Sequence, residues 1–353
     1  MQPAGSRRFF LIDVFKVLAA QLIVLHHLAW YGPMTDVAAD LSPYISLGVD
    51  WLAEHGRYAV AAFLAIGGFL AALGLAPGGL PAGKSPGRLI LQRYARLVAP
   101  YAVALVFVMI SAALARRWMV HDSIGAPPSA GQFIAHLFLL HDLLDYEALS
   151  AGVWYVAIDF QLYALLVGLI WLAGRFGRRL ASAEFFAVLL VVLGAVASLG
   201  FFNRDAEWDA TALYFFGAYA LGVGSAWSVS SARPYRGLAL VLLIGVLALL
   251  IDFRPRIAIA LAVSLLVGLG YLHLKTGGSR SIERFSQASY ALFLVHFPVC
   301  LVVNALFMRY APDSPFLNLV GILFAWVASN AAAFAFHRHV ETRLAFRLSR
   351  AVK

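Results

Sequence analysis

Four ionisable residues stand in the first apolar stretch of the chain, residues 10–31, and their types suit acid–base chemistry. They are Asp13, Lys16, His26 and His27. Lys16 and His27 are separated by about 1100° of an α-helix, so they share one face and lie about 16 Å apart along its axis. His26 points about 100° away from His27. Asp13 can pair with Lys16 at the i,i+3 spacing.

A purely structural interpretation is open for both pairs. Asp13 and Lys16 would neutralise each other near the membrane interface, with the Lys16 amine extended toward water. The histidines would be hydrogen-bonded rings at an interface. Ionisable groups inside a membrane are nevertheless functional by default, and two adjacent histidines on a helix with a charged pair favour a site.

Polar residues recur in two later apolar segments. Asp159 and Gln161 interrupt residues 152–173 and need internal partners at membrane depth. His296 lies in another apolar run, two residues before Pro298, which is expected to kink its helix.

A basic cluster precedes the third apolar segment. It comprises Lys84, Arg88, Arg93 and Arg96, and Arg93 and Arg96 stand near the expected start of a helix. Such a cluster can anchor lipid headgroups. It can also bind phosphates, since guanidinium groups grip phosphate oxygens in bidentate fashion.

The elements that must position these residues are membrane-spanning helices. The 353 residues are 62% hydrophobic and 13% charged, with a mean hydropathy of +0.82, which excludes an ordinary soluble enzyme. Apolar stretches near the roughly 20 residues that span a bilayer recur throughout. We therefore predict an all-α, polytopic transmembrane bundle of about ten spans, forming a single domain over residues 1–353. The expected spans are 10–31, 56–76, 97–115, 152–173, 183–202, 211–229, 237–252, 256–274, 287–308 and 315–337.

The charge pattern predicts the orientation. With both termini in the cytoplasm, 19 of the 27 basic residues fall in cytoplasmic segments and seven outside. The net charge of +9 therefore indicates topology rather than nucleic-acid binding. The residues 134–140 within the longest connection could form a re-entrant or interfacial helix. The single cysteine, Cys300, is interpreted as packing, and we expect no metal site because ligand spacings are absent.

Five segments in this order resemble the acyltransferase-3 family of integral membrane O-acyltransferases. The first matches a motif of a basic residue, ten residues and a histidine, which selects His27 when counted from Lys16. Two departures stand out: Gly67 replaces a usual serine and Asp159 replaces a usual glutamate. The segments are Asp13–His27, Ala62–Leu70, Arg93–Tyr101, Trp154–Tyr163 and Ser289–Pro298.

The resemblance implies transfer of an acyl group, usually acetyl, from cytoplasmic acyl-CoA to a glycan hydroxyl at the membrane or its outer face. The sequence resembles the standalone members of the family, which lack an SGNH-type domain. The expected partners are acetyl-CoA, a cell-surface or lipid-linked glycan and the lipid bilayer, in a bacterial inner membrane. Succinyl-CoA is an alternative donor.

On this basis His27 is the expected general base or a transient acyl carrier. Lys16, paired with Asp13, would orient the donor, and His26 and Asp159 are further catalytic candidates. Arg93, Arg96 and Arg88 would bind the CoA phosphates. The acceptor side is assigned to Tyr155, Trp154, His296, Gln161 and His141.

A secondary transporter or glycan flippase is the alternative function. Such a protein would also have many spans and intramembrane ionisable pairs. The sequence lacks repeated halves and matched Gly- or Pro-broken helices, so the enzyme is favoured.

Overall fold

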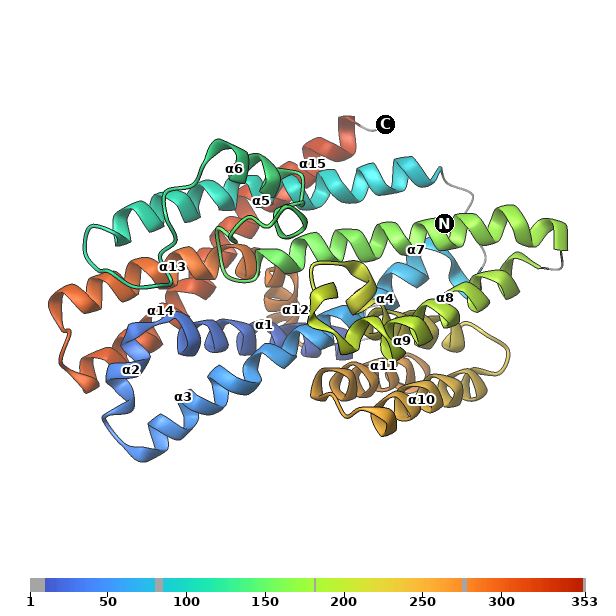
Figure 1. Cartoon of the computed structure of the whole chain (residues 1–353), viewed down its shortest axis with the longest axis horizontal. Helices are drawn as coiled ribbons and strands as arrows, with labels where there is room; N and C mark the ends of the chain where they lie inside the picture. Colours follow the sequence, from blue (N-terminus) through green and yellow to red (C-terminus); the bar gives the residue numbers. More distant parts are fainter. Residues whose placement is uncertain (1–9, 80–84, 181, 275–277, 352–353) are drawn as a thin grey trace. The chain divides into compact units, whose positions relative to one another are not determined.

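The computed structural model describes residues 10–79, 85–180, 182–274 and 278–351, and over these residues the chain is helical without strands (Figure 1). Ten of the helical segments are long and apolar enough to cross a membrane. The principal helices are α1 Phe10–Tyr31, α2 Pro33–Ala39, α3 Pro43–His55, α4 Val60–Leu75, α5 Pro86–Ala115, α6 Ala130–Leu137, α7 Val153–Leu180, α8 Ala183–Gly200, α9 Ala212–Val229, α10 Pro234–Ile251, α11 Pro255–His273, α12 Arg280–Gln287, α13 Ser289–Tyr310, α14 Pro315–Phe336 and α15 Thr342–Ala351.

The predicted fold class and number of spans are confirmed, while some helix boundaries differ. Helix α5 begins at Pro86 instead of residue 97, so Arg93 and Arg96 lie inside it. The apolar pattern cannot reveal this polar first part, and Pro86 favours a helix start there because its ring pre-sets φ. Lys84 lies outside the described residues. The cytoplasmic position of both termini stays a prediction.

The longest connection contains the expected short helix. Helix α6 has eight residues, and the Ser129 hydroxyl accepts a hydrogen bond from the Gln132 N–H at its start. It begins four residues before the predicted segment 134–140, because an N-cap serine fixes the first turn. Whether this helix enters a membrane stays a prediction.

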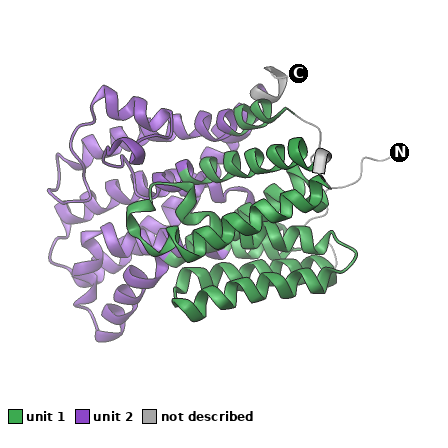
Figure 2. Ribbon diagram, turned by 45° about the vertical axis from the view of Figure 1, so that its right-hand side comes forward, with its two compact units in different colours: residues 1–17, 58–93, 158–286 green, residues 18–57, 94–157, 287–353 purple. Residues whose placement is uncertain are grey.

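The chain divides into two compact units, each made of three stretches of sequence (Figure 2). The first comprises residues 1–17, 58–93 and 158–286, and the second comprises residues 18–57, 94–157 and 287–353. The prediction of a single domain is neither confirmed nor contradicted by this division.

In the first unit, α9 is the central helix and contacts α4, α8, α10 and α11. Most of its side chains are buried. Glycines allow α4 and α9 to approach closely. A methyl group on Gly222 would collide with the Ala65 carbonyl oxygen, and a methyl group on Gly68 would collide with the Tyr219 carbonyl oxygen. Close backbone contact at small residues is a main source of helix association in membranes.

In the second unit, α13 and α14 pack together and both contact α2. The Asn304 side chain accepts a hydrogen bond from the Met34 N–H at 3.2 Å, which joins α13 to the start of α2. Gln21 on α1 bonds to both Asn330 and Trp326 on α14. These amide bonds satisfy polar groups inside apolar helices and fix the register of α1, α13 and α14.

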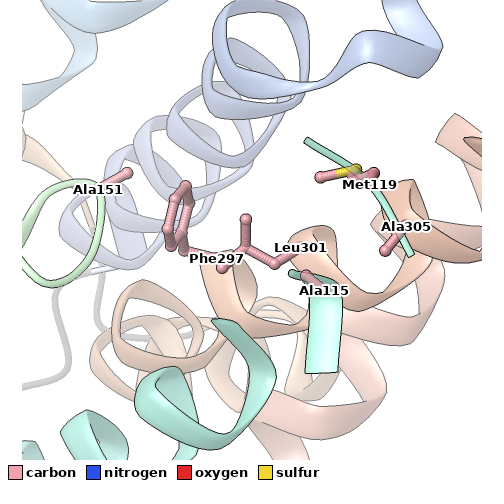
Figure 3. Packing of buried hydrophobic residues seen from close by; sticks show 6 residues of the cluster. All are labelled: Ala115, Met119, Ala151, Phe297, Leu301 and Ala305. Carbon is pink, nitrogen blue, oxygen red and sulfur yellow. The ribbon is translucent and has the colours of Figure 1, made fainter. Parts of the chain in front are cut away.

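A buried apolar cluster lies beside these helices in the second unit (Figure 3). It contains Phe297 and Leu301 of α13, and Ala151 from the connection before α7. Tyr31, at the end of α1, packs against it. The connection is thereby fixed against the helices by apolar contact.

Replacing Gly68 tests the close approach of α4 and α9. We expect Gly68→Ala to destabilise the protein by roughly 1–3 kcal/mol or more, because the new methyl group must displace a backbone carbonyl. Gly74→Ala is the matched control on the same helix, since open space surrounds that position. Melting in detergent checks both variants. Equal melting temperatures for the two would contradict the packing described.

Candidate active site

A buried pair of imidazoles joins α1 and α13 in the second unit. His27 Nδ1 lies 2.7 Å from His296 Nε2, and the two rings stack with centroids 5.0 Å apart. His27 is 8% exposed and His296 is fully buried. At this distance the rings share a hydrogen bond, as buried polar groups require.

The direction of this bond follows from the next contact. His296 Nδ1 lies 2.9 Å from the Leu292 carbonyl oxygen, which can only accept, so Nδ1 carries a proton. In neutral His296, Nε2 then accepts, and His27 donates from Nδ1. The Nε2 atom of neutral His27 therefore keeps its lone pair, and no described residue hydrogen-bonds to it. This is the arrangement of a base oriented by a second group.

His26 has a different environment from its neighbour. Its Nδ1 donates to the Leu52 carbonyl oxygen of α3 at 3.0 Å. A methyl group on Gly56 would approach the His26 Cβ to 2.6 Å, so the backbone after α3 passes close to this ring. His26 thus ties α1 to α3.

Aromatic residues and one glycine surround the histidine pair. Tyr31 meets His27 edge-on at 5.5 Å between ring centroids. Gly152 has a φ of +83°, and a Cβ there would lie 3.4 Å from His27 Cε1 and 3.0 Å from Phe293. The backbone can pass this close to His27 only because residue 152 lacks a side chain. The Tyr155 and Phe293 ring centroids lie 5.5 Å apart, and the Phe293 centroid lies 6.3 Å from that of His296.

The first unit contains a charged pair between α5 and α7. An Arg93 guanidinium nitrogen lies 2.5 Å from the Asp159 carboxylate, and the guanidinium also lies over the Tyr163 ring at 5.3 Å. A Cβ on Gly67 would lie 3.8 Å from Asp159 Oδ1 and 3.4 Å from the Tyr219 ring. The position of the expected serine therefore adjoins this carboxylate, and glycine leaves no hydroxyl there.

Asp13 is also held within the first unit. It accepts a hydrogen bond of 2.5 Å from the Ser286 hydroxyl of α12. Lys16 follows one turn later on α1. Pairing of Asp13 with Lys16 stays a prediction.

A sequence model of an acyltransferase domain, the acyltransferase-3 model, matches residues 10–338, nearly the whole chain. The chain belongs to the acyltransferase-3 family. With ten apolar helices, it is a membrane acyltransferase. No curated protein and no solved structure matches the chain.

The remaining candidates of this acyltransferase lie in varied surroundings. Gln161 accepts from the Ala212 N–H at 2.9 Å, so it caps the start of α9. Arg88 and Arg96 are exposed on α5. Trp154 meets the Tyr155 ring edge-on at the start of α7.

Two features of the acyltransferase gave no usable sequence signal. The pairing of His27 with His296 joins residues 269 positions apart. Ser286, the partner of Asp13, is an unremarkable serine in a polar segment. Gly152 was not predicted either, although a glycine directly before an aromatic-rich helix is a signal that could have pointed to it.

His141 forms a second stacked histidine pair, with His136, in the connection between α5 and α7. The ring centroids are 4.0 Å apart, and both rings are fully buried. His136 donates from Nδ1 to the Gln132 carbonyl and accepts from the Leu149 N–H. Burial lowers the pKa of His136, and burial and the neighbouring His136 lower that of His141 to about 3. Both rings are therefore neutral at pH 7.

Acid should destabilise the acyltransferase through this pair. The pKa of each ring is lower in the folded than in the unfolded state, so stability falls as the pH drops below about 6.5 and continues to fall toward pH 3. We expect His141→Phe to weaken this dependence by up to about 1.4 kcal/mol per pH unit. Melting between pH 8 and pH 4 measures it.

His339→Phe, which replaces an exposed ring, is the control for this experiment. It should keep the wild-type pH dependence. An unchanged pH dependence in His141→Phe would show that burial of the His141 ring does not contribute to acid sensitivity.

Proposed function

We propose that the protein is an O-acyltransferase that transfers an acetyl group from cytoplasmic acetyl-CoA to a hydroxyl of a cell-surface or lipid-linked glycan. The observation that carries this proposal is the orientation of His27 by His296. An imidazole whose second nitrogen is held by a hydrogen bond is a suitable general base near neutral pH.

The reaction needs one proton transfer in each direction. His27 Nε2 takes the proton of the acceptor hydroxyl while its oxygen attacks the thioester carbonyl of acetyl-CoA. The tetrahedral intermediate then collapses, the carbon–sulfur bond breaks, and His27 returns the proton to the CoA sulfur. The products are the O-acetyl ester and free CoA. His296 stabilises the His27 imidazolium that forms in between by accepting a hydrogen bond at Nε2 from the His27 Nδ1–H.

The phosphates of CoA are assigned first to Arg96 and Arg88, because both are exposed on α5. Arg93 is held by Asp159, which already satisfies its charge, so it contributes less to phosphate binding. Lys16 retains its proposed role of orienting the donor, with Asp13 fixed by Ser286. His26 is proposed to position α1 through Leu52 rather than to act as the base.

The setting proposed is a bacterial inner membrane with both termini in the cytoplasm. The excess of basic residues in the segments assigned to the cytoplasm supports this orientation. Basic residues at the donor side also suit an anionic cofactor that stays in the cytoplasm.

Binding of the donor is tested by melting the purified protein with acetyl-CoA, succinyl-CoA and CoA. A ligand at 100 times its Kd stabilises by about 2.7 kcal/mol. We expect acetyl-CoA to raise the melting temperature, and Arg88→Ala/Arg96→Ala to weaken that effect. Arg117→Ala, an exposed arginine at the opposite end of α5, is the control. Absence of stabilisation by any CoA species in folded protein would contradict the proposed function.

A further inference from the structure

A pocket of about 240 Å³ with a mixed polar and apolar lining opens in the second unit beside the histidine pair. Its walls come from the connection between α5 and α7, and its floor includes Tyr31 and Phe297. Tyr31 contacts both the His27 ring and Phe297, and Phe297 directly follows His296. The floor is therefore one aromatic layer from the imidazoles.

The connection that forms the walls also reaches His27 itself. Ser150 lines the pocket, Ala151 packs against Phe297 (Figure 3), and Gly152 places its backbone next to His27 Cε1. Three consecutive residues thus link the pocket to the base. A molecule in the pocket would have only this short segment and the aromatic floor between it and the histidine.

Ser150 is a polar residue of the pocket lining. The residue is only 4% exposed, and none of the described residues forms a hydrogen bond with its hydroxyl. Hydroxyls of buried residues normally have a partner. An unpartnered hydroxyl on a largely buried residue that lines a cavity indicates a polar ligand there.

The walls of the pocket are held by hydrogen bonds that leave two carboxylates available. Arg116 donates to the Gly125 carbonyl at 2.7 Å, and Gln132 donates to the Glu147 carbonyl at 2.8 Å. The carboxylates of Glu147 and Asp122 line the pocket, and neither has a hydrogen bond or ion pair with a described residue. Carboxylates accept hydrogen bonds from hydroxyl groups and repel anions.

We propose that this pocket binds a sugar ring of the acceptor glycan, next to the ring that carries the accepting hydroxyl. Tyr31 and Phe297 offer an apolar floor for one face of the ring, while Ser150, Glu147 and Asp122 offer partners for its hydroxyls. The volume lies just below the ~300–1,000 Å³ of drug-sized pockets and suits one ring rather than a chain. The inference rests on the proposed function and assigns its acceptor site.

A cysteine at the pocket tests the assignment, because the native chain has one cysteine, Cys300, which is buried. Ala126 is exposed and lines the pocket, so Ala126→Cys can be modified with N-ethylmaleimide. Val120→Cys is the control, since Val120 is fully exposed in the same connection and does not line the pocket. The assay uses membranes from the native cells as the source of the acceptor. Transfer is measured as radiolabel from acetyl-CoA in their glycan fraction.

We expect modified Ala126→Cys to lose at least tenfold in transfer, with unchanged stabilisation by acetyl-CoA, and modified Val120→Cys to keep both. Ser150→Ala, left unmodified, should reduce transfer several-fold with the same unchanged donor binding. Full transfer by modified Ala126→Cys and by Ser150→Ala would overturn the acceptor site while leaving the proposed function intact. Loss of acetyl-CoA stabilisation in the wild type would instead contradict the proposed function.

Discussion

The hydrogen bond between His27 and His296 is the interaction on which the site depends. Buried polar groups need hydrogen-bond partners, and these two imidazoles provide one for each other. The Leu292 carbonyl fixes the proton on His296 Nδ1, and this single contact determines the tautomers of both rings. Of the four ring nitrogens, only Nε2 of His27 keeps a lone pair that accepts no hydrogen bond from a described residue. The Leu292 carbonyl of α13 therefore orients His27 as a base, through its hydrogen bond with His296.

The rest of the second unit holds that pair in place. Asn304 joins α13 to the start of α2, and Gln21 joins α1 to α14, so both helices that carry the histidines are fixed in register. Gly152 allows the connection before α7 to approach His27. The first unit shows two further consequences of a membrane interior. Arg93 pairs with Asp159, and glycines allow α4 and α9 to approach closely. Charge must be paired there, and backbones must approach closely.

Hydropathy was sufficient for the ten spans, and the first-segment motif of the family that the sequence resembles was sufficient for the choice of His27. Both depend on local patterns, which a single sequence contains. The partner of His27 could not be predicted, since contact between α1 and α13 depends on how helices far apart in sequence pack. The same reason applies to Asp159, which was expected as a catalytic candidate and whose ion pair with Arg93 was not predicted. Gln161 was expected to bind substrate, whereas the structure shows that it caps the start of α9. The sequence does not distinguish the two roles, because both place a polar residue in an apolar span.

The role of His27 as the general base is tested most directly by measuring acetyl transfer into the glycan fraction of membranes that contain His27→Ala. The matched control is His26→Ala, which replaces the neighbouring histidine. Acetyl-CoA stabilisation of each purified variant establishes that it is folded and binds donor. We expect His27→Ala to lose at least a hundredfold in transfer, as is typical of a missing general base. We expect His26→Ala to retain most of the transfer activity. Transfer at the wild-type rate by folded His27→Ala would show that His27 is not the general base.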